Sequence, residues 1–517
     1  MTGLTGAARH VLQLALAAHA EDPATTAWLR GQIARLDEPL RVAIAGKVKA
    51  GKSTLLNALV GEQVAPTDAG ECTKVVTWYR DGPVPRIVLE PRSGPPQPLA
   101  VVRRDGALVV DLGGTPAERV ERLVVDWPSR GLRASTLIDT PGISSLSSEV
   151  SHRTVAFLDP DDESPTEADA VVYLMRHLHS ADAEFLESFR DRGVARATAV
   201  NTVAVLSRAD EVGGGRVDAL FSARSIATRY RTDPAVRGLA QDVVAVAGLL
   251  AETARTLRLD EFTALAELAR TPREQLDGEL LSVSRFLRAD PDVRGPLVRR
   301  FGIFGVRLSA TLIRQGCRTP AALSTELVTR SGLDDLRRVL HTRFTERREL
   351  LKARSALLAV ESLLHAGGPV TGRRAALAAE IERILAGAHE FTELRTLGAL
   401  RSGTTGLPRP VAEEAERLLG DAGSAPAVRL GLAPDAPPHE LRRAGFAALD
   451  RWRRHAVDPL LAHPATATSR VVVRTCEGIL AALHPAAPSH APDNVAPSHA
   501  PNHAPNHVAP GPPPRPR

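Results

Sequence analysis

Length, composition and charge already exclude several classes of protein. At 517 residues the chain is too long for one hydrophobic core, so we expect roughly two or three domains. Hydrophobic residues make up 43% of the chain but aromatic residues only 3%, which favours helical packing over an all-β sandwich. The net charge of +5 is spread over single arginines and short pairs, as is typical of a solvated surface.

The same survey indicates a cytoplasmic location. No apolar run reaches the length that a membrane-spanning helix needs, and the apolar stretch 11–18 lacks the basic start of a signal peptide. The three cysteines lie far apart and fit neither a metal site nor a disulfide framework, so we expect a reducing compartment.

The first elements of the chain predict a nucleotide-binding domain. Residues 1–38 are expected to form a helical segment, broken near Pro23, that packs with a helical bundle. Residues 41–45 form a short apolar strand, and a helix begins near residue 54. Between them, residues 46–53 read Gly-Lys-Val-Lys-Ala-Gly-Lys-Ser, which fits the pattern of a phosphate-binding loop.

The distribution of lysine supports this interpretation. The chain has five lysines against sixty arginines, and four of the five fall between Lys47 and Lys74. Because lysine and arginine are not interchangeable at crowded anionic sites, lysine is retained here where a compact ammonium is needed. Lys52 is expected to reach the β and γ phosphates, and the Ser53 hydroxyl to ligate Mg²⁺. The predicted nucleotide contacts of this loop are Gly46, Lys47, Val48, Ala50, Gly51, Lys52, Ser53 and Thr54.

Further short apolar runs predict a mostly parallel, doubly wound α/β sheet. The later runs alternate with helical stretches, as parallel strands require, whereas the earlier ones follow each other closely and predict antiparallel strands beside the sheet. These runs are residues 75–79, 87–89, 108–112, 123–125, 137–138, 171–174, 203–206 and 243–246.

Three motifs after the phosphate loop indicate GTP as the ligand. Asp139 ends a strand and begins Asp-Thr-Pro-Gly, where it can hold Mg²⁺ through water and the N–H of Gly142 can sense the γ-phosphate. Ser207-Arg-Ala-Asp is a variant of the guanine-reading Asn/Thr-Lys-x-Asp motif, with Asp210 as acceptor for the guanine N1–H and 2-amino groups. Arg208 replaces the usual lysine, and its aliphatic stem can pack on the base. Finally, the N–H of Ala247 can donate to guanine O6.

The remainder of the chain reads as helical and then disordered. We assign residues 39–345 to the nucleotide domain, with a helical insertion at about 257–330, and residues 346–480 to a helical stalk. Residues 481–517 repeat short Ala-Pro, Ser-His and Asn-His units, and we expect this tail to be disordered.

The strings Gly-Lys-Val-Lys-Ala-Gly-Lys-Ser-Thr-Leu-Leu-Asn-Ala-Leu-Val-Gly and Ala-Pro-Thr-Asp-Ala-Gly-Glu-Cys-Thr-Lys resemble the bacterial dynamin-like GTPases. Within that family they are closest to the actinobacterial isoniazid-inducible IniC/IniA group. The resemblance implies a GTPase head on a helical bundle, self-assembly or pairing with a paralogous dynamin-like GTPase, and remodelling of the inner face of the plasma membrane. It also implies that Thr73 is the switch threonine, which ligates Mg²⁺ and orients the attacking water.

One departure from other GTPases concerns catalysis. The residue after Asp-Thr-Pro-Gly is Ile143, so no glutamine side chain can position the water there. Many dynamin-type relatives use a monovalent cation held by a small polar residue of the phosphate loop, and Lys49 occupies that position. Our hypothesis is that the Lys49 ammonium replaces the cation. The alternative is an exposed loop lysine, and a strong dependence of turnover on potassium would favour that alternative.

Membrane contact and assembly stay open at this level. Residues 397–408 are either a bundle-tip loop that enters lipid or an ordinary loop between helices. The arginines around Phe446 and Trp452 either contact anionic headgroups or form the solvated face of a helix that buries Trp452. We expect no nucleic-acid partner, because a long helical region follows the GTPase domain in place of a compact RNA-binding domain. The alternatives are a regulatory GTP switch and a slow-turnover partner of a related GTPase.

Overall fold

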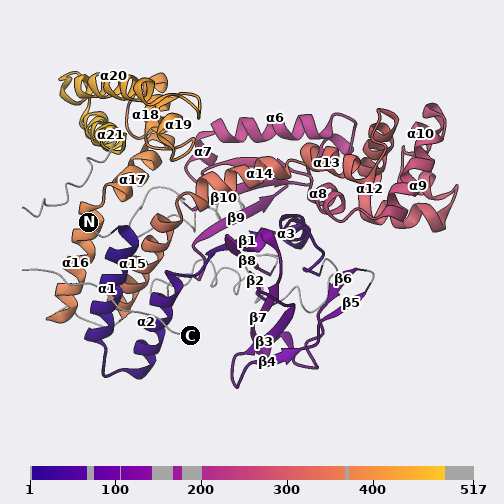
Figure 1. Ribbon diagram of the computed structural model, residues 1–517, viewed down its shortest axis with the longest axis horizontal. Coiled ribbons are helices and arrows are strands. Elements are labelled where there is room, and N and C mark those ends of the chain that lie inside the picture. The colour runs from indigo at the N-terminus through magenta and orange to yellow at the C-terminus, as the bar shows by residue number, and fades with distance from the viewer. Residues whose placement is uncertain are drawn as a thin grey trace, which may run out of the picture.

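The computed structural model describes residues 3–66, 75–104, 106–141, 167–176, 201–366 and 372–483. A twisted sheet lies near the middle of the molecule, with one group of helices at each end and a third group above (Figure 1). This arrangement confirms the predicted fold class of a mostly parallel α/β domain joined to helical bundles.

The central sheet has nine strands in the order β11-β10-β9-β1-β8-β2-β7-β3-β4. The strands from β11 to β8 are all parallel, as predicted for the doubly wound part. The earlier strands are antiparallel only in part, since β2 pairs antiparallel with β8 but parallel with β7. The bounds are β1 Leu40–Gly46, β2 Thr77–Asp81, β3 Arg86–Pro91, β4 Gln97–Leu99, β7 Val120–Trp127, β8 Ser135–Asp139, β9 Ala170–Met175, β10 Thr202–Ser207 and β11 Val243–Val246.

Two further strands, β5 (Val102–Arg104) and β6 (Ala107–Val109), form a separate hairpin. Every residue of β9, β10 and β11 is buried, because helices cover both faces of this part of the sheet. Continuous runs of valine, alanine and leucine in these strands are the sequence signature of that double burial. The motifs described above lie at the carboxyl ends of four strands of the sheet, β1, β8, β10 and β11.

Helices of the insertion share an apolar core with one face of the sheet, although α9 and α10 themselves lie beyond the end of the sheet (Figure 1). Leucine and phenylalanine side chains of the insertion, including Leu265, Phe286 and Phe301, share a core with β9 and β10. The bounds are α3 Lys52–Val60, α6 Ala219–Thr232, α7 Pro234–Arg237, α8 Gly248–Arg255, α9 Leu259–Arg270, α10 Arg273–Glu279, α11 Val283–Leu287, α12 Pro291–Arg314, α13 Pro320–Ser331 and α14 Leu333–Leu340.

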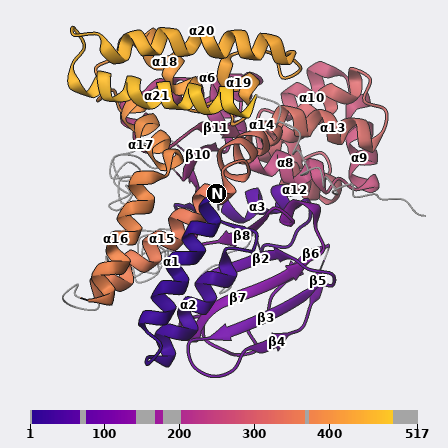
Figure 2. The ribbon, with the colours of Figure 1, turned by 60° about the vertical axis from the view of Figure 1, so that its left-hand side comes forward.

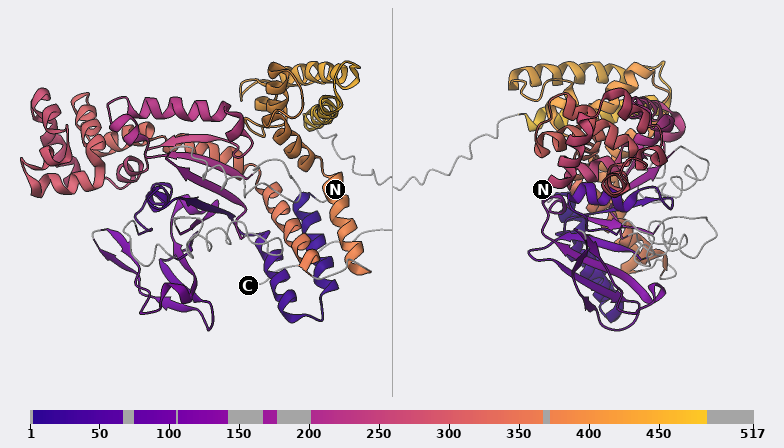
Figure 3. Two further views of the ribbon diagram at one scale, coloured as in Figure 1. Left: turned by 180° about the vertical axis from the view of Figure 1, so that it is seen from behind. Right: turned by 90° about the vertical axis from the view of Figure 1, so that its right-hand side faces the viewer.

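The N-terminal helices α1 (Leu4–Ala18) and α2 (Pro23–Arg35) pack with α15 (Arg348–Ala366) and α16 (Arg373–Gly387). Figures 2 and 3 show these helices side by side, beyond one end of the sheet. Their shared apolar core includes Leu12 and Leu357, and Val11 is also fully buried. From here on, "stalk" means these four helices, which combine α1 and α2 with only the first part of the predicted stalk 346–480.

A buried charge cluster joins the stalk to the nucleotide domain, and we call it the inner joint. Arg35 Nη2 donates to Asp169 Oδ1 at 2.6 Å, with the two side chains 6% and 0% exposed. The backbone N–H of Arg41 donates to Asp169 Oδ2, and Lys352 Nζ donates to the carbonyl of Arg35. Burial alone would raise the pKa of Asp169, but the Arg35 and Lys352 cations hold it below its ordinary value.

Five helices at the C-terminal side form a further unit, which we call the C-terminal module. Its helices are α17 His389–Arg401, α18 Arg409–Leu418, α19 Pro426–Leu430, α20 Pro438–Val457 and α21 His463–Ala482. In Figure 2, α20 and α21 lie together at the top of the molecule, far from β3 and β4. Within the described residues no helix is both long and apolar enough to cross a membrane.

The module bears on the two regions for which the sequence left membrane contact open. Leu397 and Leu400 belong to α17 and are buried, so these leucines of residues 397–408 do not form a lipid-exposed loop. Trp452 is fully buried in the module, as expected for a helix that turns its tryptophan toward a core, while Phe446 is 53% exposed.

Candidate nucleotide site

The phosphate loop connects the end of β1 to the start of α3, as the sequence predicts. Gly46 has φ 146° and a Cβ there would lie 2.5 Å from the carbonyl oxygen of Leu174, so only glycine fits. Lys49 has φ 61°, which is uncommon for a residue with a side chain. Gly51, with φ 95°, precedes the first residue of α3, so the free N–H groups of the helix start face the loop. Such a helix start favours bound anions.

Lys52 lies within this loop and not on the surface. Its side chain is largely buried, and Nζ donates to the carbonyls of Gly46 at 3.3 Å and Lys47 at 3.5 Å. Burial lowers the pKa of Lys52, while the Asp139 carboxylate opposes that shift. The Lys52 ammonium is therefore poorly solvated and close to the place where phosphates would bind.

Ser53 and Asp139, the two predicted Mg²⁺ ligands that the structure describes, lie in contact. Ser53 Oγ donates to Asp139 Oδ2 at 2.7 Å, whereas the buried Asp139 Oδ1 has no hydrogen-bond partner within the described residues. Burial raises the pKa of Asp139, so its carboxylate lacks the solvation that an isolated charge needs. A hydroxyl and a carboxylate oxygen are ligands that Mg²⁺ prefers, and the unpartnered Oδ1 fits a cation.

A cavity of about 160 Å³ lies beside the loop. One side is formed by Ala50, Gly51 and Thr54, and the other by the motif residues Ser207, Arg208 and Asp210. The fold therefore brings the phosphate loop and the guanine-reading motif, separated by more than 150 positions in the sequence, to one pocket. The remaining lining residues are Leu55, Leu174, Val205, Glu211, Val246, Gly248 and Leu249.

Asp210 suits a ligand with paired N–H donors. Its side chain is nearly buried, and burial raises its pKa above the ordinary value. A base that donates two hydrogen bonds would compensate the desolvated carboxylate, as guanine can. Ser207 is buried beside it, and its hydroxyl donates to the carbonyl of Met175 at 3.1 Å.

The expectation for Ala247 is corrected by the structure. The Ala247 N–H donates to the carbonyl of Ser331 at 2.9 Å and is therefore already engaged. Gly248, the next residue, lines the cavity and is the first residue of α8, where N–H groups lack intrahelical acceptors. The N–H groups that this segment offers at the cavity are therefore those at the start of α8, at Gly248, and not that of Ala247.

Arg208 has a role that the sequence did not reveal. Its backbone adopts φ 53°, and its Nη2 donates to the carbonyl of Lys49 at 2.9 Å, while Nη1 pairs with Glu211 at 2.7 Å. The guanidinium thus ties the base-reading loop to the phosphate loop. Arg176 Nη2 approaches the same carbonyl at 3.4 Å. This contact between Arg208 and Lys49, two residues with a left-handed backbone, was not predictable from the motif pattern.

A second cluster missed by sequence reasoning fixes the chain after α3. Asn57 Oδ1 accepts from the N–H groups of Val64 and Ala65, and Asn57 Nδ2 donates to the buried Glu252 at 3.2 Å. Gln63 also donates to Glu252 at 3.0 Å. Since Glu252 belongs to α8, this cluster links the base pocket to the segment that leads toward Thr73.

Two predicted catalytic residues, Thr73 and Gly142, lie outside the described residues, as does Ile143. Among the other predicted residues, Val48 and Lys49 are exposed, and Lys47 is half-buried. The ammonium of Lys49 therefore lies on the open side of the loop while its carbonyl is held by Arg208.

The strand, phosphate loop, helix and buried aspartate define the class of phosphate-loop nucleotide-binding proteins. A family model described as "Dynamin family" matches residues 42–86, which contain the phosphate loop. The isoniazid-induced protein IniC of Mycobacterium tuberculosis is 43% identical over 455 residues, covering 87% of this chain and 91% of that protein. The chain belongs to the dynamin family, in the group of IniC.

More distant relatives agree with this assignment. The bacterial dynamin-like protein of Nostoc punctiforme is 24% identical over 296 residues, covering 54% of this chain and 39% of that protein. A solved structure titled for "an oligomerised bacterial dynamin pair" aligns over 93% of this chain and 74% of that one. The TM-score of that alignment is 0.31, at 13% sequence identity.

Proposed function

We propose that this protein binds GTP with Mg²⁺ and hydrolyses it to GDP and phosphate. The observation that carries the proposal is the pocket that joins the phosphate loop to Asp210, with the unpartnered oxygen of Asp139 beside Ser53. Membership of the dynamin family supports GTPase activity in general. An adenine base lacks the N1–H and 2-amino donors that Asp210 would accept, so the pocket favours guanine.

Each described residue has a task in this scheme. The N–H groups of the loop and of the α3 start would bind the β-phosphate, and Lys52 would contact the β and γ phosphates. Ser53 and Asp139 would hold Mg²⁺, which supplies charge neutralisation for phosphoryl transfer. Thr73 and Gly142 remain proposed as the groups that orient the attacking water and sense the γ-phosphate. Lys49 remains proposed as the substitute for a monovalent cation.

Phosphate release from GTP, with ATP as the control nucleotide, tests the activity. We expect release from GTP and at least a hundredfold lower release from ATP. Asp210→Ala should weaken GTP binding about a hundredfold, since it removes charge-assisted hydrogen bonds to the base. Equal use of both nucleotides would contradict the base assignment, and undetectable hydrolysis with tight GTP binding would favour a regulatory switch or a slow partner subunit.

We also propose that GTP turnover is coupled to self-association, or to association with a paralogous dynamin-like GTPase, at the inner face of the plasma membrane. Family membership supports this in general, and the proposed location is cytoplasmic and peripheral. Turnover should be measured over a range of protein concentrations, with and without anionic liposomes. We expect the rate per molecule to rise with both. A rate that is flat in both variables would contradict the coupling.

A further inference from the structure

The C-terminal module has its own apolar core. The cluster contains Leu397, Leu418, Trp452, Val472 and Leu480 and draws all of its buried members from residues 397–480. The cores of the nucleotide domain and of the stalk are separate clusters, although Phe391 at the start of α17 packs with the stalk. The module is therefore a self-contained folding unit joined to the rest through α17.

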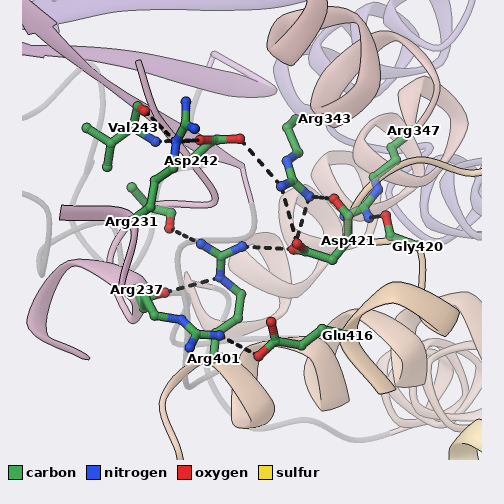
Figure 4. Close-up of polar contacts among 11 residues, drawn as sticks. Arg231, Arg237, Asp242, Val243, Arg343, Arg347, Arg401, Glu416, Gly420 and Asp421 are labelled. Carbon is green, nitrogen blue, oxygen red and sulfur yellow. Dashed lines mark hydrogen bonds and ion pairs between the residues drawn. The ribbon is translucent and has the colours of Figure 1, made fainter. Parts of the chain in front are cut away.

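Polar contacts hold this unit against the nucleotide domain (Figure 4). Arg237, the last residue of α7, pairs with Glu416 of α18, and their side chains are 22% and 12% exposed. Here the module supplies the donor as well: Arg401 of α17 donates to the carbonyls of two residues of the nucleotide domain, Ala240 at 2.8 Å and Arg237 at 3.4 Å. Figure 4 shows these side chains reaching across the seam from opposite sides.

A second group of contacts across this seam is centred on the carboxylate of Asp421. It accepts from Arg401 Nη1 at 2.9 Å and from Arg343 Nη1 at 3.1 Å. Arg343 lies in the π-helical turn His341–Thr345 and also pairs with Asp242 at 3.5 Å, so one guanidinium bridges the module and the nucleotide domain. Arg347 Nη2 donates to the carbonyl of Gly420 at 2.5 Å.

The packing between the module and the stalk, beside this seam, is also incomplete. A cavity of about 520 Å³ lies where α1, α15 and α17 meet the loop after α18, and charged side chains such as Arg348, Glu349 and Glu390 contribute to its lining. A small cluster of Leu394 with Leu350 lies beside it. Interfaces that are polar and poorly filled resemble those of transient contacts between domains.

We propose that the contacts of Arg237, Arg343 and Arg401 with Glu416 and Asp421 form a releasable latch between the C-terminal module and the nucleotide domain. In the docked state the module is held by charge; when the pairs are broken it swings about α17 with its own core intact. The latch side chains are 8–25% exposed while docked, so salt acts mainly on the charges freed in the released state, and by screening them it favours release.

The latch is placed to sense the nucleotide. Asp242, which Arg343 contacts, directly precedes β11, and β11 ends at the pocket residue Val246, two positions before the pocket residue Gly248. A change in the pocket that shifts β11 changes the geometry of the latch, and linkage requires that release changes nucleotide affinity in return. The coupling of the latch to nucleotide binding rests on the proposed function, whereas the docking of the module does not.

Distance measurements on the full chain test the latch. Spectroscopic labels are placed at Thr228→Cys on α6 and Ala447→Cys on α20, both exposed sites, after replacement of the three native cysteines. Arg237→Glu and Glu416→Arg should each lengthen the most populated distance between the two labels, and the double variant should restore it. Arg453→Glu, which breaks an ion pair inside the module with Glu477, is the matched control and should leave the distance unchanged. One molar KCl should lengthen the distance in the unmodified chain.

Two results would overturn the latch: single variants that keep the docked distance while remaining folded by circular dichroism, or a double variant that stays open. Binding of a fluorescent GDP analogue tests the coupling, and we expect Arg237→Glu to change its Kd at least threefold, with the double variant returning toward the original value. Equal Kd values with an open module would refute the coupling. If the analogue does not bind the unmodified chain, the proposed function fails, and the distance measurements still judge the latch.

Discussion

The inner joint and the latch both connect the nucleotide domain to helices, but they are built differently. In the inner joint, Asp169 is fully buried, contacts Arg35 and a backbone N–H, and lies next to the apolar core of the stalk. In the latch, Asp421 is 25% exposed, while its partners Arg343 and Arg401 are 8% and 10% exposed, and the adjacent Gly420 lines a cavity. A fully buried carboxylate loses its compensating charges if the joint opens, whereas a carboxylate that already contacts solvent can be hydrated when the module separates.

The largest expected effect is on the inner joint. Asp169→Ala would leave Arg35 and Lys352 as buried charges without their carboxylate, and we expect the free energy of unfolding to fall by about 3–5 kcal/mol. Urea denaturation measures this change. A fall below about 1 kcal/mol would erase the distinction between the two connections.

The corresponding change in the latch should cost less. Asp421→Ala leaves Arg343 and Arg401 facing each other, but both can turn toward solvent once the module moves, so we expect a loss of about 1–2 kcal/mol. The same denaturation experiment gives the value. Equal losses for Asp169→Ala and Asp421→Ala would mean that the seam is as fixed as the inner joint.

The pH dependence of stability reports on the inner joint alone, through the protonation of Lys352. Burial and the neighbouring arginines lower the pKa of Lys352 to about 8, although Asp169 opposes this shift. The unfolded chain keeps this proton up to its ordinary pKa of 10.5, so between pH 8 and 10.5 the unfolded state binds more protons and stability from this group rises with pH. We expect this rise in the free energy of unfolding to be at most about 3 kcal/mol, since each pKa unit of the Lys352 shift corresponds to about 1.4 kcal/mol.

The measurement compares the unmodified chain with Lys352→Met over this pH range, because other groups titrate there and cancel in the difference. The rise should vanish in the variant. A rise of equal size in both proteins would show that Lys352 is not perturbed in the folded state.

The smallest effect is expected at an exposed pair close to the inner joint. Glu38 pairs with Arg41 at 2.8 Å, but the Glu38 side chain is 46% exposed. We expect Glu38→Ala to change the free energy of unfolding by less than about 0.5 kcal/mol. A loss comparable to that of Asp169→Ala would show that proximity to the joint, and not burial, determines the cost.

Much of the fold was predictable from local pattern. The buried strands of the parallel sheet were each preceded or followed by helical spacing, and the phosphate loop lay between a strand and a helix, so β1, β9, β10 and β11 were expected. The short strands β4 and β5 were missed, because Pro98 and the exposed arginines of β5 give no apolar alternation.

The remainder depends on contacts between distant positions. The pairing of Ala247 with Ser331, and of Arg208 with Lys49, involves backbone carbonyls whose location no motif encodes. The inner joint unites residues 35, 169 and 352 from three separate elements. Likewise, helical spacing after residue 346 predicts helices but does not say that they divide into two apolar cores. Motifs therefore predicted the pocket, and not what restrains it.

The scarcity of lysine makes chemical labelling of amines selective for the phosphate loop. Lys52 and Lys352 are 8% and 3% exposed, and Lys74 lies outside the described residues, so Lys47 and Lys49 are the most accessible side-chain amines of the described region. An acylating reagent used sparingly would mark the rim of the phosphate loop among sixty silent arginines. Mass spectrometry of the peptides would measure the extent of acylation at these lysines with and without ligand, and protection by the ligand would show that the loop is occupied.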